Sequence, residues 1–214
     1  METYEYVAAI VLAYLIGSLS SALWIGKIFY GIDIRKHGSC NLGATNAFRV
    51  LGKNAGIPVL LIDICKGSLA VLLAFIFFPS IKGSDSFIGI QYLLGFAAVL
   101  GHVFPVYAGF RGGKGIATLL GIMIVIEPMA AGVSVLVFLL MLVFSGFVSL
   151  SSISGVFVFP LISIFVFKST SPAFVVFSFA AFMLVLLTHR ENLQRLFDRT
   201  EARVTLIKRN KKFF

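Results

Sequence analysis

The sequence predicts an all-α integral membrane protein with seven transmembrane helices. The first reason is composition: 59% of the 214 residues are hydrophobic, only 13% are charged, and the mean hydropathy is +1.01. A soluble domain of this length cannot bury so much apolar surface, so the bilayer must be part of its solvent. The second reason is that apolar runs alternate with short polar loops. The third is that basic residues gather in alternate loops, as membrane topology requires.

Seven apolar runs can be marked, and we take each as one helix. A helix needs about 20 residues to cross about 30 Å of hydrocarbon. The first run follows an acidic start, METYEY, and is too long for a signal sequence, so we expect a retained helix. The runs cover residues 7–29, 56–78, 87–107, 115–126, 129–144, 147–167 and 172–188.

The second, third and fourth runs contain or adjoin polar and helix-breaking residues, which indicate charge pairing, a kink and a helix boundary. The second contains Asp63 and Lys66, whose i,i+3 spacing lets the two charges neutralise each other. The third reaches Pro105, which frees a backbone carbonyl near the helix end. The fourth has about a dozen residues and spans roughly 18 Å, too little to cross. Glu127 and Pro128 form a turn signal that separates it from the fifth; merging these two runs would give six spans.

The distribution of charge orients the chain. Seven spans place the termini on opposite sides, and one side then holds only Lys82 and Lys168 as basic residues. This predicts an external N-terminus and a cytoplasmic C-terminus, whereas six spans would place the tail opposite the loop around residue 35. Residues 1–214 then form one membrane domain with a basic tail from about residue 189, and the net charge of +9 reflects topology rather than nucleic-acid binding. The basic residues of the cytoplasmic side are Lys27, Arg35, Lys36, Arg49, Lys53, Arg111 and Lys114, then Arg190, Arg195, Arg199, Arg203, Lys208, Arg209, Lys211 and Lys212.

The loop before the fourth run reads FRGGKGIAT and has the features of an anion site. Gly112, Gly113 and Gly115 allow a positive φ or a close approach to a ligand. The helix N-terminus that follows offers free N–H groups and the positive end of its dipole, and Lys114 adds a cation. The loop is not a Walker motif, because Gly115 replaces the Ser or Thr. The alternative is a tight, positively charged turn.

A second donor-rich cluster, GSCNLGATNAFRVLG, follows the first run. It places Ser39, Asn41, Thr45 and Asn46 among glycines, and hydroxyls, amides and exposed N–H groups of this kind suit phosphate oxygens. A short helix is expected next, on which Arg49 could grip a phosphate with two hydrogen bonds. An interfacial loop with helix caps is the alternative. Two such clusters on one face favour phosphate binding.

Four further polar groups have open roles. His189 and Asn192 lie where the last run leaves the membrane, either in a site or as a helix end meeting anionic lipid. The serines of VSLSS, including Ser149, lie at the start of the sixth run and are common helix caps. His102 either satisfies the kink at Pro105 or faces the site; we favour the second. The pair Asp63 and Lys66 is either functional or a packing device. The two cysteines form no pattern typical of a disulfide or a metal site, and we expect no metal or cofactor.

Taken together, these motifs resemble the PlsY family, the bacterial acyl-phosphate:glycerol-3-phosphate acyltransferases. The resemblance runs in order over almost the whole chain, and its specific parts are the stretch around residues 33–52 and the GGKGIAT motif. Two positions depart from the family pattern. Cys40 replaces a glycine, so the loop must bend differently if a positive φ is needed there, and an arginine that often precedes SLSS is missing. The matching segments read GSLSSA, DIRKHGSCNLGATNAFRVLG, DICKG, GHVFPVYAGFRGGKGIAT, SLSS and HRENLQRL.

The resemblance implies an enzyme of the bacterial cytoplasmic (inner) membrane, with its active site formed by the cytoplasmic loops. It would transfer a fatty acyl group from acyl phosphate to the sn-1 hydroxyl of glycerol 3-phosphate, giving lysophosphatidic acid and phosphate. Ser39, Asn41, Gly43 and Thr45 would hold the acyl phosphate. The pocket for glycerol 3-phosphate would be formed by Arg49, Lys114, Ser149, His189 and Asn192, with Lys114 at its centre. We therefore expect catalytic roles for Lys114, His189 and Ser149, and substrate binding by Ser39, Asn41, Gly43, Thr45, Asn46, Arg49, His102, Gly112, Gly113 and Asn192.

The implied chemistry needs few catalytic groups. Acyl phosphate is an activated mixed anhydride, so orientation and charge stabilisation can suffice. No histidine is followed five residues later by aspartate, and no Ser–His–Asp set is evident, so we expect direct attack without an acyl-enzyme. The substrate's own phosphate or His189 would accept the proton.

Two other functions compete with this one. A transporter of phosphorylated metabolites would need a midplane site between repeats, and no repeat is evident. A scaffold that binds anionic lipid would explain the basic tail but neither glycine-rich loop. The expected partners are the two substrates and membrane lipid, with no nucleic acid and no obligate protein partner.

Overall fold

The computed structural model describes residues 3–169 and 171–204, and within these the chain is entirely helical. Apart from three short 3-10 turns, the regular elements are α-helices. The part of the predicted basic tail that contains Lys208, Arg209, Lys211 and Lys212 lies outside the described residues. The helices are α1 (Thr3–Gly17), α2 (Ser21–Tyr30), α3 (Ala44–Leu51), α4 (Lys53–Phe77), α5 (Asp85–Val103), α6 (Ile116–Ile126), α7 (Pro128–Ser145), α8 (Val148–Phe165), α9 (Pro172–Thr188) and α10 (Arg190–Phe197); the 3-10 turns are η1 (Ile34–Lys36), η2 (Pro79–Ile81) and η3 (Val106–Ala108).

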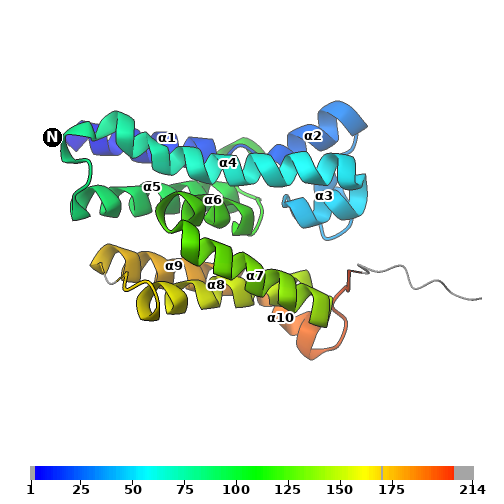
Figure 1. The fold of residues 1–214 in the computed structure, drawn as a ribbon. Coiled ribbons are helices and arrows are strands. Elements are labelled where there is room, and N and C mark those ends of the chain that lie inside the picture. Colours follow the sequence, from blue (N-terminus) through cyan, green and yellow to red (C-terminus); the bar gives the residue numbers. More distant parts are fainter. Residues whose placement is uncertain (1–2, 170, 205–214) are drawn as a thin grey trace, which may run out of the picture.

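The long helices run roughly parallel to one direction and form three tiers (Figure 1). In this view α1 and α4 lie in the upper tier, α5 and α6 in the middle, and α7, α8 and α9 below. The tiers are connected because α5 packs against α1, α4 and α9, and α6 packs against α4 and α7. The short helices α2, α3 and α10 lie toward the same end of the molecule, opposite the N-terminus. That end carries the polar loops.

The first apolar run is not one helix. It divides into α1 and α2, which meet at a bend of 42° around Ser18–Ser20 and were predicted as a single run over residues 7–29. The bend exposes backbone carbonyls that a straight helix would use internally. Ser20 Oγ donates to the Ser18 carbonyl, and Lys66 Nζ of α4 donates to the Leu19 carbonyl at 3.0 Å. A buried cation therefore replaces a lost helical hydrogen bond, which the apolar pattern alone could not indicate.

The division between the fourth and fifth runs is confirmed. Glu127 has φ −134° and ψ 63°, so it ends α6, and Pro128 begins α7 at a position where its missing N–H costs nothing. The alternative of one merged helix is therefore wrong. The short α6 has 11 residues and packs closely on α4: a Cβ at Gly121 would lie 2.0 Å from the Ile64 carbonyl oxygen. Only glycine permits this approach.

The number of spans differs from a simple count of seven. Four helices are long and apolar enough to cross a bilayer, and six spans result if each bent pair, α1 with α2 and α9 with α10, counts as one. The α6 helix falls below the length of a span, as its sequence predicted. The structure thus confirms an all-helical, multi-pass membrane protein but not the count of seven.

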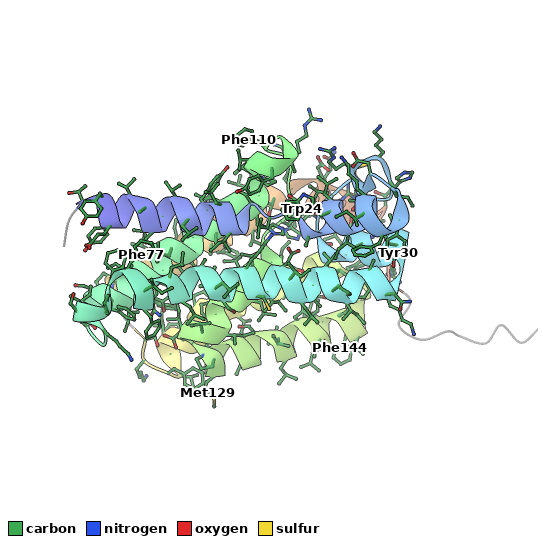
Figure 2. The ribbon with its side chains drawn as sticks, turned by 90° about the horizontal axis from the view of Figure 1, so that it is seen from above. Trp24, Tyr30, Phe77, Phe110, Met129 and Phe144 are labelled. Carbon is green, nitrogen blue, oxygen red and sulfur yellow. The ribbon has the colours of Figure 1, made fainter. Side chains whose placement is uncertain are left out.

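The outer surface is apolar, as expected of a protein surrounded by lipid. Large hydrophobic side chains point outward from the helices, among them Met129 and Phe144 of α7, which are 70% and 82% exposed (Figure 2). Trp24 and Tyr30 of α2 lie near the end that carries the polar loops. Such outward apolar side chains would aggregate in water and are stable in a bilayer.

Candidate active site

A cavity of about 610 Å³ opens at the end of the molecule that carries α3 and α10. Its walls come from α3, α4, α6, α7, α8 and α10, from His102 of α5, from the loops before α3 and α6, and from the segment that follows α10. The cavity brings together every predicted site residue except two: Gly112 lies outside its walls, and Gly113 lines an adjoining chamber. The predicted residues that line it are Ser39, Asn41, Gly43, Thr45, Asn46, Arg49, His102, Lys114, Ser149, His189 and Asn192.

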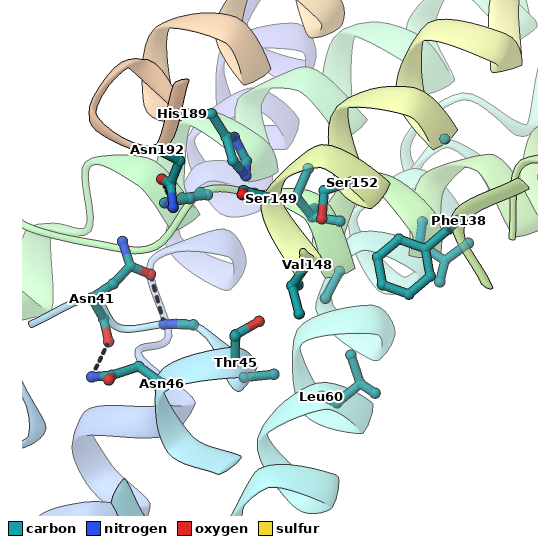
Figure 3. Close-up of a pocket in the computed structure, with 18 of the residues that line it drawn as sticks. Asn41, Thr45, Asn46, Leu60, Phe138, Val148, Ser149, Ser152, His189 and Asn192 are labelled. Atoms are coloured by element: carbon teal, nitrogen blue, oxygen red, sulfur yellow. Dashed lines mark hydrogen bonds between the residues drawn. The ribbon is translucent and has the colours of Figure 1, made fainter. Parts of the chain in front are cut away.

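The cavity has a polar side and an apolar side. In Figure 3, Asn41, Thr45 and Asn192 lie toward one side, and Leu60 and Phe138 lie toward the other. The apolar lining continues along four membrane helices. It consists of Leu60 and Ile64 of α4, Ile116, Leu120 and Met123 of α6, Val135, Phe138 and Leu139 of α7, and Val148 and Val156 of α8.

The loop before α3 is organised by Asn46. Its Nδ2 donates to the carbonyls of His37 and Asn41 at 3.1 and 3.0 Å, and its Oδ1 accepts from the Ser39 N–H at 2.9 Å. The side chain is 1% exposed, and its amide is fully engaged with the loop backbone. Asn46 therefore organises the loop; it also lines the cavity, and its predicted contact with substrate stays a prediction. Figure 3 shows Asn46 bonded to Asn41, which faces the cavity.

Cys40 keeps the backbone conformation that a glycine would adopt. Its φ is 57°, in the left-handed region, and its N–H donates to the His37 carbonyl at 3.0 Å. We expected the loop to bend differently with cysteine if a positive φ is needed at this position. Cys40 itself adopts the positive φ and bears the strain of that conformation.

The glycine-rich loop before α6 is folded back onto the end of α5. Gly112 and Gly113 donate their N–H groups to the carbonyls of Val103 and His102, both at 3.1 Å. Their N–H groups are therefore engaged with backbone, and their predicted role in substrate binding stays a prediction. Only Gly115 has a positive φ, 82°, among the three glycines, and it begins α6. Gly115 lines the cavity together with Ile116, so the N-terminus of α6 faces it, as predicted.

Lys114 lies at the centre of a chain of polar contacts. Its Nζ donates to Asn192 Oδ1, and Asn192 Nδ2 donates to Glu201 Oε1 at 2.6 Å. Burial lowers the pKa of Lys114 to about 8, against the opposing effect of the Glu201 carboxylate; Arg195 and Arg49 lower it further. The ammonium form therefore predominates at neutral pH, but its proton is more easily lost than that of an exposed lysine.

Glu201 is a site residue that the sequence did not reveal. It accepts hydrogen bonds from Ser149 Oγ at 2.7 Å, from Asn192, and from Arg195 Nε at 2.8 Å. Burial raises the pKa of this carboxyl, but the three hydrogen bonds outweigh burial and hold the pKa below its ordinary value. The carboxylate orients Ser149 and Asn192 toward the same region as Lys114.

Glu201 reaches the site because the chain reverses after α10. Arg199 adopts a φ of 57°, and the N–H groups of Thr200 and Glu201 donate to the Arg195 carbonyl at 2.8 and 3.1 Å. The following segment is held by a hydrogen bond from Val204 N–H to the Gly146 carbonyl. No local pattern predicts this reversal. Arg195 could have been found, because it lies three residues after Asn192 and so on the same helical face.

His189 is 2% exposed and lies at the junction of α9 and α10. Its Nδ1 lies 2.9 Å from the Val185 carbonyl oxygen. A carbonyl only accepts, so this contact places the proton on Nδ1 and leaves Nε2 as the acceptor in the neutral ring. Ser149, the other candidate from this group, is bonded to Glu201 and not to His189, so no serine–histidine nucleophile pair forms between them.

His102 also lines the cavity, in agreement with the interpretation that it faces the site. The carbonyls of His102 and Val103 at the end of α5 accept from the glycine-rich loop. Its Nδ1 lies 3.8 Å from Asp63 Oδ1, and Asp63 lines the cavity as well. Asp63 is paired with Lys66 at 3.0 Å.

A second chamber of about 410 Å³ adjoins the first. It shares Ser39, Asn41, Lys114, Asn192 and Arg195 with the larger cavity and is otherwise lined by the ends of α5 and α9 and the start of α10. The polar residues that the two share, Lys114 and Asn192 among them, thus lie where the larger cavity adjoins the second chamber.

Comparison of the sequence with known proteins identifies one family. The family model of glycerol-3-phosphate acyltransferase matches residues 7–199. Curated glycerol-3-phosphate acyltransferases from Enterococcus faecalis and Streptococcus pneumoniae are 41% and 39% identical to this chain. The first alignment covers 97% of this chain and 96% of the relative, and the second covers 91% of each.

Solved structures agree. The crystal structure of PlsY (YgiH), described as an integral membrane glycerol 3-phosphate acyltransferase in its glycerol 3-phosphate form, matches with a TM-score of 0.84 and 34% identity over 94% of this chain and 96% of that one. Its lysophosphatidic acid form matches with a TM-score of 0.80 and 33% identity, over 94% and 95% of the two chains. The family prediction is confirmed: this chain is a membrane-embedded acyltransferase and belongs to the glycerol-3-phosphate acyltransferase family.

Proposed function

We propose that this enzyme transfers a fatty acyl group from acyl phosphate to the sn-1 hydroxyl of glycerol 3-phosphate, releasing lysophosphatidic acid and inorganic phosphate. The observation that carries the proposal is the meeting of two donor-rich loops, one with Asn41 and one with Lys114, in a single cavity that continues into an apolar channel. A site for two phosphate groups and one acyl chain needs this combination. The related PlsY structures in glycerol 3-phosphate and lysophosphatidic acid forms support the acceptor and the product.

The acceptor would bind at the Lys114 end. Lys114, Arg49 and Arg195 supply positive charge to this part of the cavity, opposed by the Glu201 carboxylate. Charge-assisted hydrogen bonds to a phosphate are worth about 1.5–3 kcal/mol each in such a setting. Asn192, whose amide is oriented by Glu201, would add a hydrogen bond.

The donor would bind with its phosphate at the loop before α3 and its acyl chain along the apolar lining. Leu139 of α7 lines the cavity and is 49% exposed, which supports an opening of the apolar part of the cavity toward lipid. The acyl chain can therefore remain in contact with lipid. Glycerol 3-phosphate would enter from water through the second chamber, which Arg190 and Arg195 line.

The transfer would be direct, without a covalent acyl-enzyme. The glycerol hydroxyl attacks the acyl carbonyl, the carbon–oxygen bond to phosphate breaks, and phosphate leaves with the bonding electrons. The proton passes to the phosphate or to His189 Nε2, which the contact of Nδ1 with Val185 leaves free to accept. The engagement of Ser149 with Glu201 favours an orienting role for this serine rather than a nucleophilic one.

The proposed orientation places the active site on the cytoplasmic side of a bacterial inner membrane, with the N-terminus outside and the C-terminus inside. The basic residues predicted to be cytoplasmic, where the structure describes them, include Lys27, Arg49 and Lys114, and they lie at or near the end that carries the site. Both proposed substrates are intracellular metabolites by their chemistry, which fits this orientation.

Purified protein in lipid vesicles tests the function. With palmitoyl phosphate present, inorganic phosphate should appear only when glycerol 3-phosphate is added, together with lysophosphatidic acid. Transport of labelled glycerol 3-phosphate into sealed vesicles without consumption of palmitoyl phosphate would show a transporter instead. Phosphate release without glycerol 3-phosphate would indicate a hydrolase.

Replacement of Lys114 by methionine tests the site itself. Lys114→Met removes the central cation, so kcat/KM for glycerol 3-phosphate should fall by about a hundredfold or more while the protein remains folded. Arg111→Met is the matched control, because Arg111 is an exposed cation of the same loop that lines neither chamber. Activity near the parent level in Lys114→Met would contradict the assignment.

A further inference from the structure

A buried ionic cluster lies inside the membrane domain next to the cavity. Asp63, Lys66 and His102 are 1%, 3% and 5% exposed. Asp63 Oδ1 accepts a hydrogen bond from Ser21 Oγ at 2.8 Å and pairs with Lys66 Nζ at 3.0 Å. Lys66 also donates to the Leu19 carbonyl at 3.0 Å. The cluster therefore connects α4 to the break between α1 and α2, and it fixes the Asp63 carboxylate from two sides.

His102 connects this cluster to the glycine-rich loop. On one side of the ring, Nδ1 lies 3.8 Å from Asp63 Oδ1, which is longer than a hydrogen bond. On the other side lies Gly113, where a Cβ would stand only 2.0 Å from His102 Nε2. The N–H of Gly113 also donates to the carbonyl of His102 at 3.1 Å. The imidazole is thus placed between a fixed carboxylate and the residue that precedes Lys114.

The polar nature of these groups needs an explanation beyond packing. Among the described residues, Asp63 Oδ2 and His102 Nδ1 are buried without a hydrogen-bond partner. Such atoms destabilise a fold, and apolar side chains of the same size would pack there without that cost. Because both residues line the cavity, their retention is explained better by the site than by the stability of the helices.

We propose that His102 is a positioning residue: its imidazole, which lies between Asp63 and Gly113, supports Gly113 and so sets the position of Lys114 in the phosphate pocket. This inference rests on the proposed function, in which Lys114 binds the phosphate of glycerol 3-phosphate. A shift of the ring would move the loop and weaken binding of that substrate. It would act on KM for glycerol 3-phosphate more than on KM for the acyl donor.

A double-mutant cycle tests the contact between the ring and the glycine. Gly113→Ala should raise KM for glycerol 3-phosphate by about tenfold or more, because the new methyl group overlaps the imidazole. His102→Ala alone should raise it as well, since the loop loses its support. In the double variant the methyl group fills part of the vacated space, so KM should fall back toward that of His102→Ala alone. Non-additivity of this kind is the signature of direct contact.

Gly112→Ala is the matched control. A Cβ at Gly112 would lie 2.0 Å from the His102 carbonyl oxygen, which is backbone and remains when the side chain is truncated. His102→Ala should therefore not rescue Gly112→Ala. Equal rescue of both alanine variants would show a general loosening and overturn the proposal. The proposal would also be overturned if the double variant had the same KM for glycerol 3-phosphate as Gly113→Ala and the same yield of folded protein in size-exclusion chromatography.

The role of Asp63 is tested by a second cycle. Asp63→Asn should raise KM for glycerol 3-phosphate in the parent enzyme but have little further effect in the His102→Ala background, because it acts through the ring. An equal increase of KM in both backgrounds would show that Asp63 does not act through His102 and would overturn that part of the proposal. All these variants are compared with a parent that releases phosphate from palmitoyl phosphate. Absence of that parent activity would refute the proposed function, whereas failed rescue in an active parent would refute only the positioning role.

Discussion

At the scale of single residues, Lys114 shows how the fold changes the chemistry of a side chain. In water its ammonium group would stay charged far above neutral pH. In the site it is half-buried beside Arg49 and Arg195, and only Glu201 and Glu191 oppose the loss of its proton. Burial is the largest effect and lowers the pKa to about 8. The lysine is therefore charged when the substrate is absent at neutral pH, but it lies close to the range in which it would lose that charge.

A pH dependence of catalysis follows from this value. Only the protonated form attracts a phosphate dianion, and a lowered pKa means that the proton is lost as the pH rises through about 8. The value of kcat/KM for glycerol 3-phosphate reports the free enzyme, so it should be greatest near pH 7 and fall by about tenfold per pH unit well above pH 8. At the acid end, the second ionisation of the substrate phosphate, near pH 6, should limit binding.

Steady-state kinetics between pH 6 and about 10 would measure this profile. In Lys114→Arg the charge persists at all these pH values, so any activity that remains should lack the alkaline fall. A parent profile that stays level beyond pH 9 would contradict the assignment of Lys114 as the cation that binds the acceptor.

At the scale of helices, α6 determines where the glycine-rich loop before it lies. The helix is too short to span a bilayer, and its N-terminus at Gly115 faces the cavity. Its position is set by close contact with α4 at two glycines: a Cβ at Gly67 would lie 2.1 Å from the Thr118 carbonyl oxygen, and one at Gly121 would lie 2.0 Å from that of Ile64. Because backbone atoms meet there, any side chain would push the helices apart.

Gly121→Ala should therefore destabilise the protein. The added methyl group overlaps the α4 backbone and also disturbs the hydrogen bond from Ser68 Oγ to the Gly121 carbonyl, 2.9 Å long. Overpacking of this kind costs about 1–3 kcal/mol, which should appear as a lower thermal unfolding midpoint in detergent. Gly132→Ala on α7 is the control, because a Cβ there meets nothing within 4 Å. Identical midpoints for the two variants would refute the close contact as the cause of the α4–α6 arrangement.

At the scale of the whole molecule, the two chambers support the proposed routes of the two substrates. The larger cavity has an apolar lining along four helices, and the second chamber is lined in part by the start of α10. The polar residues that both chambers share, Lys114 and Asn192 among them, lie where the two meet. The proposed enzyme would need such a division, because it joins a lipid-soluble donor to a water-soluble acceptor.

The proposed orientation in the membrane can be tested with the native cysteines. Cys40 is exposed on the loop before α3, and Cys65 is exposed on the membrane-spanning α4, where lipid would cover it. A membrane-impermeant maleimide should label Cys40 in inverted vesicles but not in intact cells. A Cys40→Ser variant should lose this labelling, which identifies the site. Labelling of Cys40 in intact cells would reverse the proposed orientation.

Sequence by itself determined the class of the protein and most of the site. The apolar composition requires a bilayer, and the turn at Glu127 and Pro128 is local chemistry that any surroundings would preserve. The two donor-rich loops were found because glycines, amides and isolated cations between apolar runs have few other uses. The two loops can be recognised from their local sequence, and the prediction that Asn41 and Lys114 line one cavity is confirmed.

Only the tertiary structure decided what depends on distant contacts. The bend between α1 and α2 is satisfied by Lys66 from another helix, and Glu201 enters the site through a chain reversal after α10. The hydrogen bonds by which Asn46 organises its loop reach backbone groups up to 12 residues away, which the sequence pattern did not indicate. The physical reason is common to all three: a polar group in a membrane protein must find partners, and which partners it finds depends on which helices the fold brings beside it.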